Sequence, residues 1–194
     1  MLPDMCVHCA NSVKQTRRHY WQRPWFHRSP TMTRSIGPGL RHYWQRLARW
    51  PGGAWLFSRA LGLTVPYTGT LGARVQRLTP GHCRVTLRDR RRVRNHLRSV
   101  HAIALANLGE MVTGLALLNS LPDRTRGILT GISVDYLKKA RGTLCAECRC
   151  DIPDSNAAGE QSVTGTIRDS AGDTVATVQA RWLIGPEKED PGVD

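Results

Sequence analysis

The chain has 194 residues, enough for one domain with a substantial core but short for two. Its net charge of +13 is concentrated, because residues 1–34 and 88–98 each hold six basic residues and one Asp and together supply +10 of it. Two separate patches lack the continuous basic-aromatic pattern of a nucleic-acid-binding surface, so we expect no nucleic acid as partner.

The composition also argues against secretion and against a membrane span. The first ten residues, MLPDMCVHCA, lack the charged start and the apolar core of a secretory signal. The most apolar stretch, 100–118, contains His101, Asn107 and Glu110, which favours a buried helix over a membrane span. Six cysteines without a secretion signal indicate reduced thiols and a cytoplasmic protein.

The cysteine spacing does not predict a metal centre. The pairs at 6–9 and 145–148 both read C-x-x-C, which is the spacing of a zinc knuckle. The second pair lies in a stretch that alternates like a strand, so Cys145 points to the opposite side from Cys148 and Cys150. We therefore expect small, half-buried thiols and no metal.

The N-terminal residues 1–36 are predicted to be a basic, poorly ordered extension. Three interpretations stay open: a mistaken start upstream of Met32, an Arg-rich targeting or surface-binding arm, or a docking segment. The folded domain is expected to span 37–186, with a disordered tail at 187–194.

Two helices are predicted. The first covers about 40–62, and Tyr43, Leu47 and Trp50 fall on one of its faces. The second covers about 100–119 and is apolar on almost every side. A helix of the second kind needs cover around most of its circumference.

Period-two alternation of apolar residues predicts six strands, at about 70–78, 82–88, 127–137, 143–150, 161–168 and 174–184. The turn sequence DSAGD joins the last two as a hairpin. A parallel sheet would need a crossover helix between successive strands, and only one helix interrupts these. We therefore expect an α+β hotdog fold, a curved antiparallel sheet wrapped around one long helix, with an extra N-terminal helix.

The start of the apolar helix is the candidate reactive site. Ser99 can cap it, and the amides of 101–103 lack partners within the helix, so they would polarise a thioester carbonyl. Glu110 lies seven residues after Ile103 and therefore faces the same way. Partial shielding from water raises the pKa of a carboxylate, which suits a general base. The alternative is a structural ion pair with one of the arginines at 90–94 across a subunit interface.

The segment NHLRSVHAIALANLGE, which runs from Asn95 to Glu110, resembles the N-x-x-G-x-x-H-G-G…(D/E) pattern of hotdog acyl-CoA thioesterases of the phenylacetate-degradation type. The spacing agrees at Asn95, His101 and Glu110. A second block, ISVDYLKKARGTL, is similar to the family's Y/F-L-x-P-A-x-x-G-like run and matches it at Tyr136, Leu137, Ala140 and Gly142. The resemblance covers about residues 65–185 and is nearest to a little-characterised bacterial branch.

This resemblance implies an acyl-CoA substrate, no cofactor, and a pocket between two subunits of a homodimer or homotetramer. Glu110 would be the nucleophile or general base, the amide of Ile103 would polarise the carbonyl, and Asn95 and His101 would shape the pocket. The further substrate contacts that we expect are Ala102, Arg92, Arg94, Thr113 and Thr130, and the arginines would meet the phosphates of coenzyme A.

The sequence departs from the family pattern at two points. Ala102 and Ile103 stand in place of two glycines, and Arg98 stands in place of a third. A hotdog module that binds acyl-CoA without hydrolysing it is therefore an alternative. A hydroxyacyl dehydratase that pairs His96 with Glu110 is another, but the Pro-Gly-rich segment of those enzymes is missing between the two residues.

Overall fold

The computed structural model describes residues 35–187 of the chain. The N-terminal extension with its three interpretations, the Cys6–Cys9 pair and nearly all of the predicted tail lie outside these residues.

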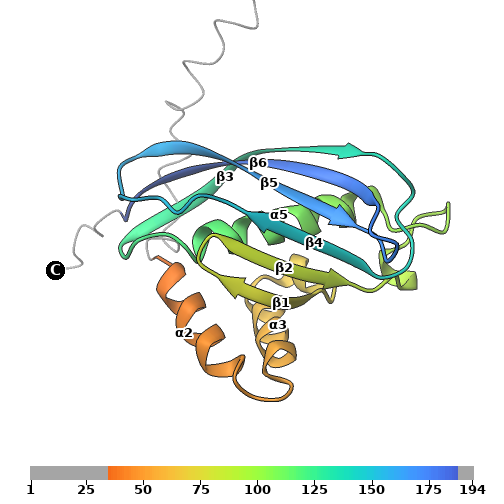
Figure 1. Cartoon of the computed structure of the whole chain (residues 1–194), viewed down its shortest axis with the longest axis horizontal. Helices are drawn as coiled ribbons and strands as arrows, with labels where there is room; N and C mark the ends of the chain where they lie inside the picture. Colours follow the sequence, from red (N-terminus) through yellow and green to blue (C-terminus); the bar gives the residue numbers. More distant parts are fainter. Residues whose placement is uncertain (1–34, 188–194) are drawn as a thin grey trace, which may run out of the picture. The chain divides into compact units, whose positions relative to one another are not determined.

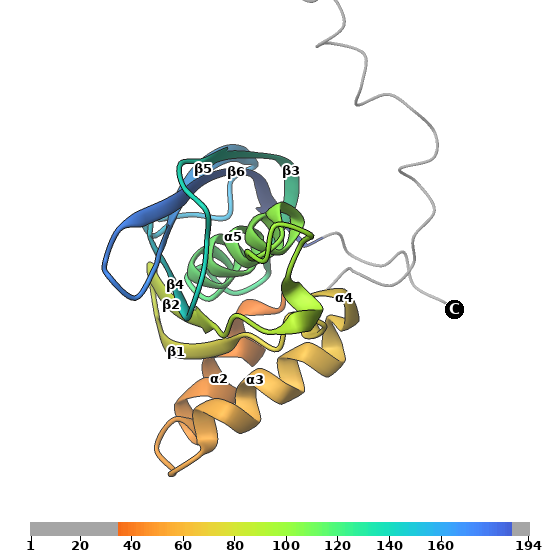
Figure 2. The same ribbon diagram turned by 90° about the vertical axis from the view of Figure 1, so that its right-hand side faces the viewer.

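Six strands form one antiparallel sheet in the order β1-β2-β4-β5-β6-β3 (Figure 1). The sheet curves around the long helix α5 (Ala102–Leu118), as Figure 2 shows along the helix. The predicted α+β class and hotdog fold are confirmed. The strands are β1 (Arg74–Thr79), β2 (His82–Leu87), β3 (Thr125–Tyr136), β4 (Leu144–Arg149), β5 (Gly159–Arg168) and β6 (Thr174–Pro186).

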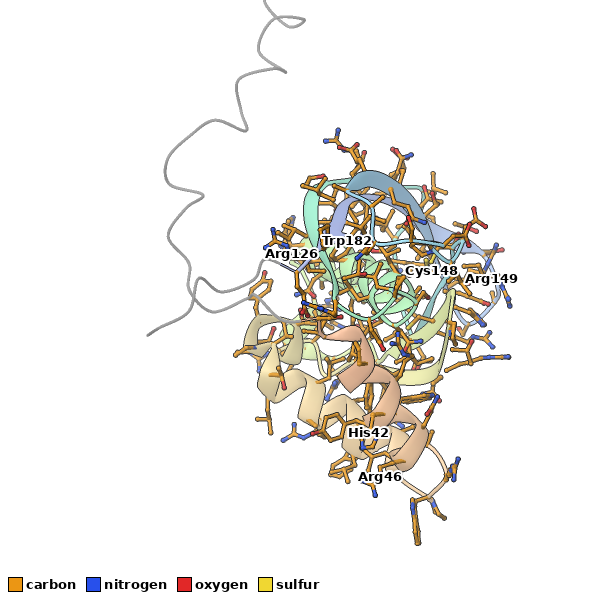
Figure 3. The ribbon with its side chains drawn as sticks, turned by 90° about the vertical axis from the view of Figure 1, so that its left-hand side faces the viewer. His42, Arg46, Arg126, Cys148, Arg149 and Trp182 are labelled. Atoms are coloured by element: carbon orange, nitrogen blue, oxygen red, sulfur yellow. The ribbon has the colours of Figure 1, made fainter. Side chains whose placement is uncertain are left out.

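On β2 and β4 the alternation follows the predicted pattern, because one face of these strands covers α5. On β2, Cys83, Val85 and Leu87 are fully buried, whereas Arg84 between them is exposed. On β4, Cys148 is buried, whereas Arg149 points away from the sheet (Figure 3). This period of two is the ordinary consequence of a pleated strand with one apolar face.

The predicted hairpin between β5 and β6 is also confirmed. One carboxylate oxygen of Asp169 accepts hydrogen bonds from the backbone N–H groups of Ala171 and Asp173, each at 3.0 Å. Gly172 has φ +90°, a conformation that favours glycine.

The single helix predicted at 40–62 is wrong. Two helices, α2 (Gly37–Leu47) and α3 (Gly53–Thr64), occupy this region, and the short α4 (Pro66–Gly69) follows. The chain turns at Pro51-Gly52, where Gly52 has φ +81°. A Pro-Gly pair is an ordinary turn sequence, and the prediction overlooked it.

The turn also changes which face of α2 is buried. Tyr43 and Trp50, expected on the inner face, are 63% and 72% exposed. Trp44 instead packs edge-on against Phe57 of α3, with ring centroids 5.1 Å apart. The buried face of α2 is therefore the one that packs against α3 and carries Trp44, and it differs from the face expected for one continuous helix.

One edge of the sheet is covered by a helix and the other is not. At the β1 edge, the backbone N–H of Val75 donates to Oγ of Ser58 on α3 at 2.9 Å, so α3 covers this edge. At the other edge, β3 pairs only with β6 among the described residues, and its Ile128 and Ile132 are 45% and 41% exposed. A long uncovered edge with apolar side chains can pair with another strand.

The backbone of α5 lies very close to the sheet at Gly109. A Cβ atom added there would lie 2.3 Å from a methyl carbon of Val178 on β6. Atoms cannot approach that closely, so any side chain at position 109 would push the helix away from the sheet.

We therefore expect Gly109→Ala to lower the free energy of unfolding by about 2 kcal/mol through overpacking. The matched control is Gly39→Ala on α2, where nothing lies within 4 Å of the added atom. The control should be neutral or stabilising by up to about 1 kcal/mol, because Ala is the better helix former. Urea unfolding of both variants measures the difference, and equal effects would contradict the close contact.

Candidate functional site

One stripe of α5 is left uncovered by the sheet. Ile103 is 54% exposed and Glu110 is exposed, while Ala106 between them is half-buried. The expectation that Glu110 is shielded from water is wrong for a single chain, because the sheet wraps the opposite side of the helix. The expectation that Ile103 and Glu110 face the same way is confirmed.

A cavity of about 610 Å³ lies beside the start of α5. It brings together four of the predicted site residues, Arg92, Arg94, His101 and Ile103. Glu110, Asn95, Ala102, Thr113 and Thr130 do not line it. The other lining residues are Tyr67, Thr70, Leu71, Val93, Ala104 and Asn107.

The helix is capped by His101 and not by Ser99 as predicted. The N–H of Ile103 donates to Nδ1 of His101 at 3.1 Å. Nδ1 can accept only when it carries no proton, so the ring proton of the neutral imidazole sits on Nε2. The Ile103 amide is therefore already engaged in this conformation, and a substrate carbonyl would have to displace the imidazole to reach it.

Asn95 organises the loop before the helix and does not line the cavity, contrary to expectation. Its Oδ1 accepts from the N–H of Leu97 at 2.9 Å, and from the N–H and the hydroxyl of Ser99, each at 3.2 Å. Asn side chains commonly bind nearby backbone in this way to fix a turn. Asn95 thus positions the chain that leads into His101.

The residue in place of the third family glycine sits in a glycine conformation. Arg98 has φ +54°. An L-residue with a Cβ is strained in this left-handed region, which costs about 1–2 kcal/mol. This geometry gives a physical reason for a glycine at this point of the pattern, and the chain tolerates arginine there at a cost in stability.

Three further predicted contacts are engaged within the chain. Thr113 is fully buried and its hydroxyl donates to a carbonyl of its own helix, so it is not placed to touch a substrate. The hydroxyl of Thr130 donates to the carbonyl of Arg181 at 3.1 Å. The carbonyl of Ala102 accepts from the hydroxyl of Tyr136 at 3.0 Å, and burial raises the pKa of that phenol.

Asn107 is a cavity residue that the sequence reasoning did not select. It is 94% buried, and its side-chain oxygen has no hydrogen-bond partner among the described residues. A buried polar atom without a partner is costly, and because this oxygen has almost no accessible surface, a donor group in the cavity would reach it only if the Asn107 side chain moved. The sequence does carry a signal for this residue: Asn107 is an amide in an otherwise apolar helix, and it lies four residues after Ile103.

The two predicted arginines differ in their partners. Arg94 forms an ion pair with Asp89, with Nε 2.6 Å from the carboxylate. The second oxygen of Asp89 accepts from the N–H of Gly142 at 3.1 Å, and these contacts, chiefly the Arg94 bond, lower the pKa of Asp89. Arg92 has no hydrogen-bond or ion-pair partner in the part of the chain that the structure describes.

No metal site or membrane-spanning helix is present in residues 35–187. No group of three His, Cys, Asp or Glu side chains there could hold an ion. No helix in that range is both long and apolar enough to cross a bilayer. On β4, Cys145 lies beside Nε of Arg84 at 3.1 Å, on the opposite side from Cys148, as predicted.

Comparison with known proteins gives the family. Residues 53–184 match the model of the family described as "Domain of unknown function (DUF4442)". The chain belongs to this family. No curated protein matches the sequence.

Solved structures confirm the fold. The structural genomics protein APC5556 is 28% identical, covers 76% of this chain and 99% of its own, and has a TM-score of 0.68. The Pseudomonas aeruginosa protein PA5026, named a probable thioesterase, is 22% identical with coverages of 71% and 97% and a TM-score of 0.62. The Escherichia coli PaaI protein of the phenylacetic acid degradation operon is 17% identical with coverages of 74% and 94% and a TM-score of 0.56.

One of the similar structures contains a thioester ligand. The Streptococcus mutans protein smu.793, bound to acetyl-CoA, is 20% identical to this chain, with coverages of 59% and 90% and a TM-score of 0.51.

We expect Arg98→Gly to stabilise the protein by about 1 kcal/mol, because glycine adopts a positive φ without strain. Arg98→Ala is the control, since it removes the same side chain but keeps a Cβ and hence the strain. Thermal unfolding should show a higher Tm for the Gly variant alone. An equal rise in both variants would mean that charge relief, and not backbone strain, is responsible.

Proposed function

We propose that the protein is an acyl-CoA thioesterase in which Glu110 is the general base or nucleophile. The observation that carries this proposal is the open stripe on α5, where an exposed carboxylate faces the same way as a helix start that borders a cavity. The hotdog thioesterase fold and the acetyl-CoA bound to a similar structure support the substrate class. The cytoplasm, where thioesters and reduced thiols coexist, is the proposed compartment.

In the proposed reaction the thioester carbonyl lies at the start of α5. Glu110 takes a proton from water while the water oxygen attacks the carbonyl carbon, the C–S bond breaks, and the coenzyme A thiolate leaves and is protonated. Positive potential at the helix start stabilises the oxyanion. The side-chain amide of Asn107 lies in the same cavity and would hold a polar group of the substrate.

The proposed active unit is a homodimer or a homotetramer built on it. Glu110 and the cavity residues His101 and Ile103 lie about two helical turns apart on one chain, which is too far for both to act on one carbonyl. A second copy that joins at the β3 edge would cover the α5 stripe and place its own helix start near Glu110. Pairing would also bury Ile128 and Ile132.

A second candidate function is acyl-CoA binding without hydrolysis. The bond from the Ile103 amide to His101 favours it, because this amide is the predicted oxyanion donor. The side chain of Ile103 would also narrow the approach that a glycine leaves open. The two candidates differ in turnover and not in binding.

We expect Glu110→Gln to lower kcat at least 100-fold, since general-base catalysis contributes about 10²–10⁴. Glu160→Gln on β5 is the matched control, an exposed glutamate away from α5, and should retain full activity. Thiol release from short, aromatic and long acyl-CoAs measures both variants beside the wild type. Binding without any turnover by the wild type would favour the second candidate, and an active Glu110→Gln variant would exclude Glu110 as base.

Ile132→Lys should convert the proposed dimer to monomers, because a charge at the uncovered edge opposes strand pairing. Ile152→Lys is the control, as Ile152 is 50% exposed but lies outside the strands. Light scattering after gel filtration reports the mass of each variant. A monomeric wild type, or a dimer that survives Ile132→Lys, would argue against assembly through β3.

A further inference from the structure

A second and larger cleft, of about 700 Å³, lies between α3 and α4 on one side and the first two strands on the other. The segment that follows β2 also lines it, as does Met111 of α5. Its walls carry five arginines and no Asp or Glu. The arginines are Arg59, Arg74, Arg88, Arg90 and Arg92.

The positive charge of this cleft is not balanced by the protein. Arg90 donates to the carbonyl oxygens of Leu71 and Gly72 at 3.2 and 3.0 Å, which carry no net charge. The side chains of the other four cleft arginines form no ion pair or hydrogen bond within the described residues. No acidic residue occurs anywhere from 5 to 88, and Asp89 is paired with Arg94. Like charges facing one cleft repel, and a polyanion relieves that repulsion.

The backbone segment that carries three of these arginines is also held in place. Arg88, Arg90 and Arg92 are alternate residues of one segment, and Asp89 between them anchors that segment through Arg94 and the N–H of Gly142. Gly72 leaves room for the Arg90 guanidinium, because a Cβ there would lie 2.4 Å from its nitrogen. A guanidinium group on an anchored backbone segment binds phosphate with less ordering cost than one on a mobile segment.

We propose that this cleft binds the phosphates of coenzyme A, and that its arginines make the enzyme prefer coenzyme A thioesters over thioesters carried on a protein. The proposal rests on the proposed function. The nucleotide end of coenzyme A carries a diphosphate and a 3′-phosphate, which match several guanidinium forks. Trp55 on the cleft wall offers an apolar surface to the adenine ring.

The position of the cleft fits a ligand that reaches the reacting carbon. Arg92 and Thr70 line both this cleft and the cavity at the start of the helix. A long ligand with its phosphates in the cleft can therefore extend toward the α5 start. On a carrier protein the acyl group is held by a phosphopantetheine arm with a single phosphodiester, which offers the cleft less negative charge than the diphosphate and 3′-phosphate of coenzyme A.

The first test measures binding without chemistry. Adenosine 3′,5′-bisphosphate is titrated calorimetrically into the full chain, into Arg74→Gln/Arg88→Gln, and into the control Arg77→Gln/Arg84→Gln. The control removes the same charge at two exposed positions of β1 and β2 that lie outside the cleft. We expect at least 10-fold weaker binding for the cleft variant only. Equal binding by both variants, or equal losses in both, would overturn the proposal.

The second test compares two substrates with the same acyl chain, one on coenzyme A and one on N-acetylcysteamine, which has no phosphate. The cleft variant should raise KM at least 10-fold for the coenzyme A thioester and leave the short thioester unchanged. Equal losses on both substrates would mean a structural role, and faster hydrolysis of an acyl carrier protein thioester than of acyl-CoA would also overturn the proposal. Arg59→Gln on α3 repeats the comparison should the double variant fail to fold.

The two proposals fail in different ways. Bisphosphate binding that depends on the cleft, with no turnover of any thioester, would leave the cleft assignment standing and remove the catalytic function. Turnover that depends on Glu110, with bisphosphate binding unaffected in the cleft variant, would leave the catalytic function standing and remove the cleft assignment.

Discussion

The close seating of α5 on the curved sheet is the constraint on which the rest of this structure depends. An apolar helix gains its stability by removing its side chains from water, and here the backbone itself approaches β6 at Gly109. This contact fixes the rotation of the helix about its axis. Because that rotation is fixed, Ile103 and Glu110 stay exposed, with the half-buried Ala106 between them on the same side of the helix.

The curved sheet covers only part of the helix, and this incomplete cover leaves the Glu110 carboxylate in contact with solvent. A carboxylate on the covered side would need a buried partner, at a cost of several kcal/mol without one. On the open stripe Glu110 meets no such penalty. The uncovered β3 edge and the uncovered stripe belong to the same chain, so one association of two copies would complete both.

The loop before α5 and the first turn of α5 have other residues at the glycine positions of the family pattern, and the loop's own contacts hold it in place. Arg98 adopts the left-handed conformation that the pattern assigns to glycine, and Asn95 holds the turn around it. His101 then caps the helix through the Ile103 amide. The positive φ that favours glycine is thus present at position 98 although the residue is arginine, and the side chains of Ala102 and Ile103 change the space available to a ligand.

The sequence by itself determined the fold class, the six strands, the central helix and the shared direction of Ile103 and Glu110. Each of these follows from local periodicity, which depends only on the backbone geometry of strands and helices. Only the tertiary structure decided that Glu110 is exposed, that Thr113 is buried, and that arginines from α3, β1 and the segment after β2 face one cleft. Exposure and clustering depend on which elements pack against each other, and periodicity within one element carries no information about its neighbours.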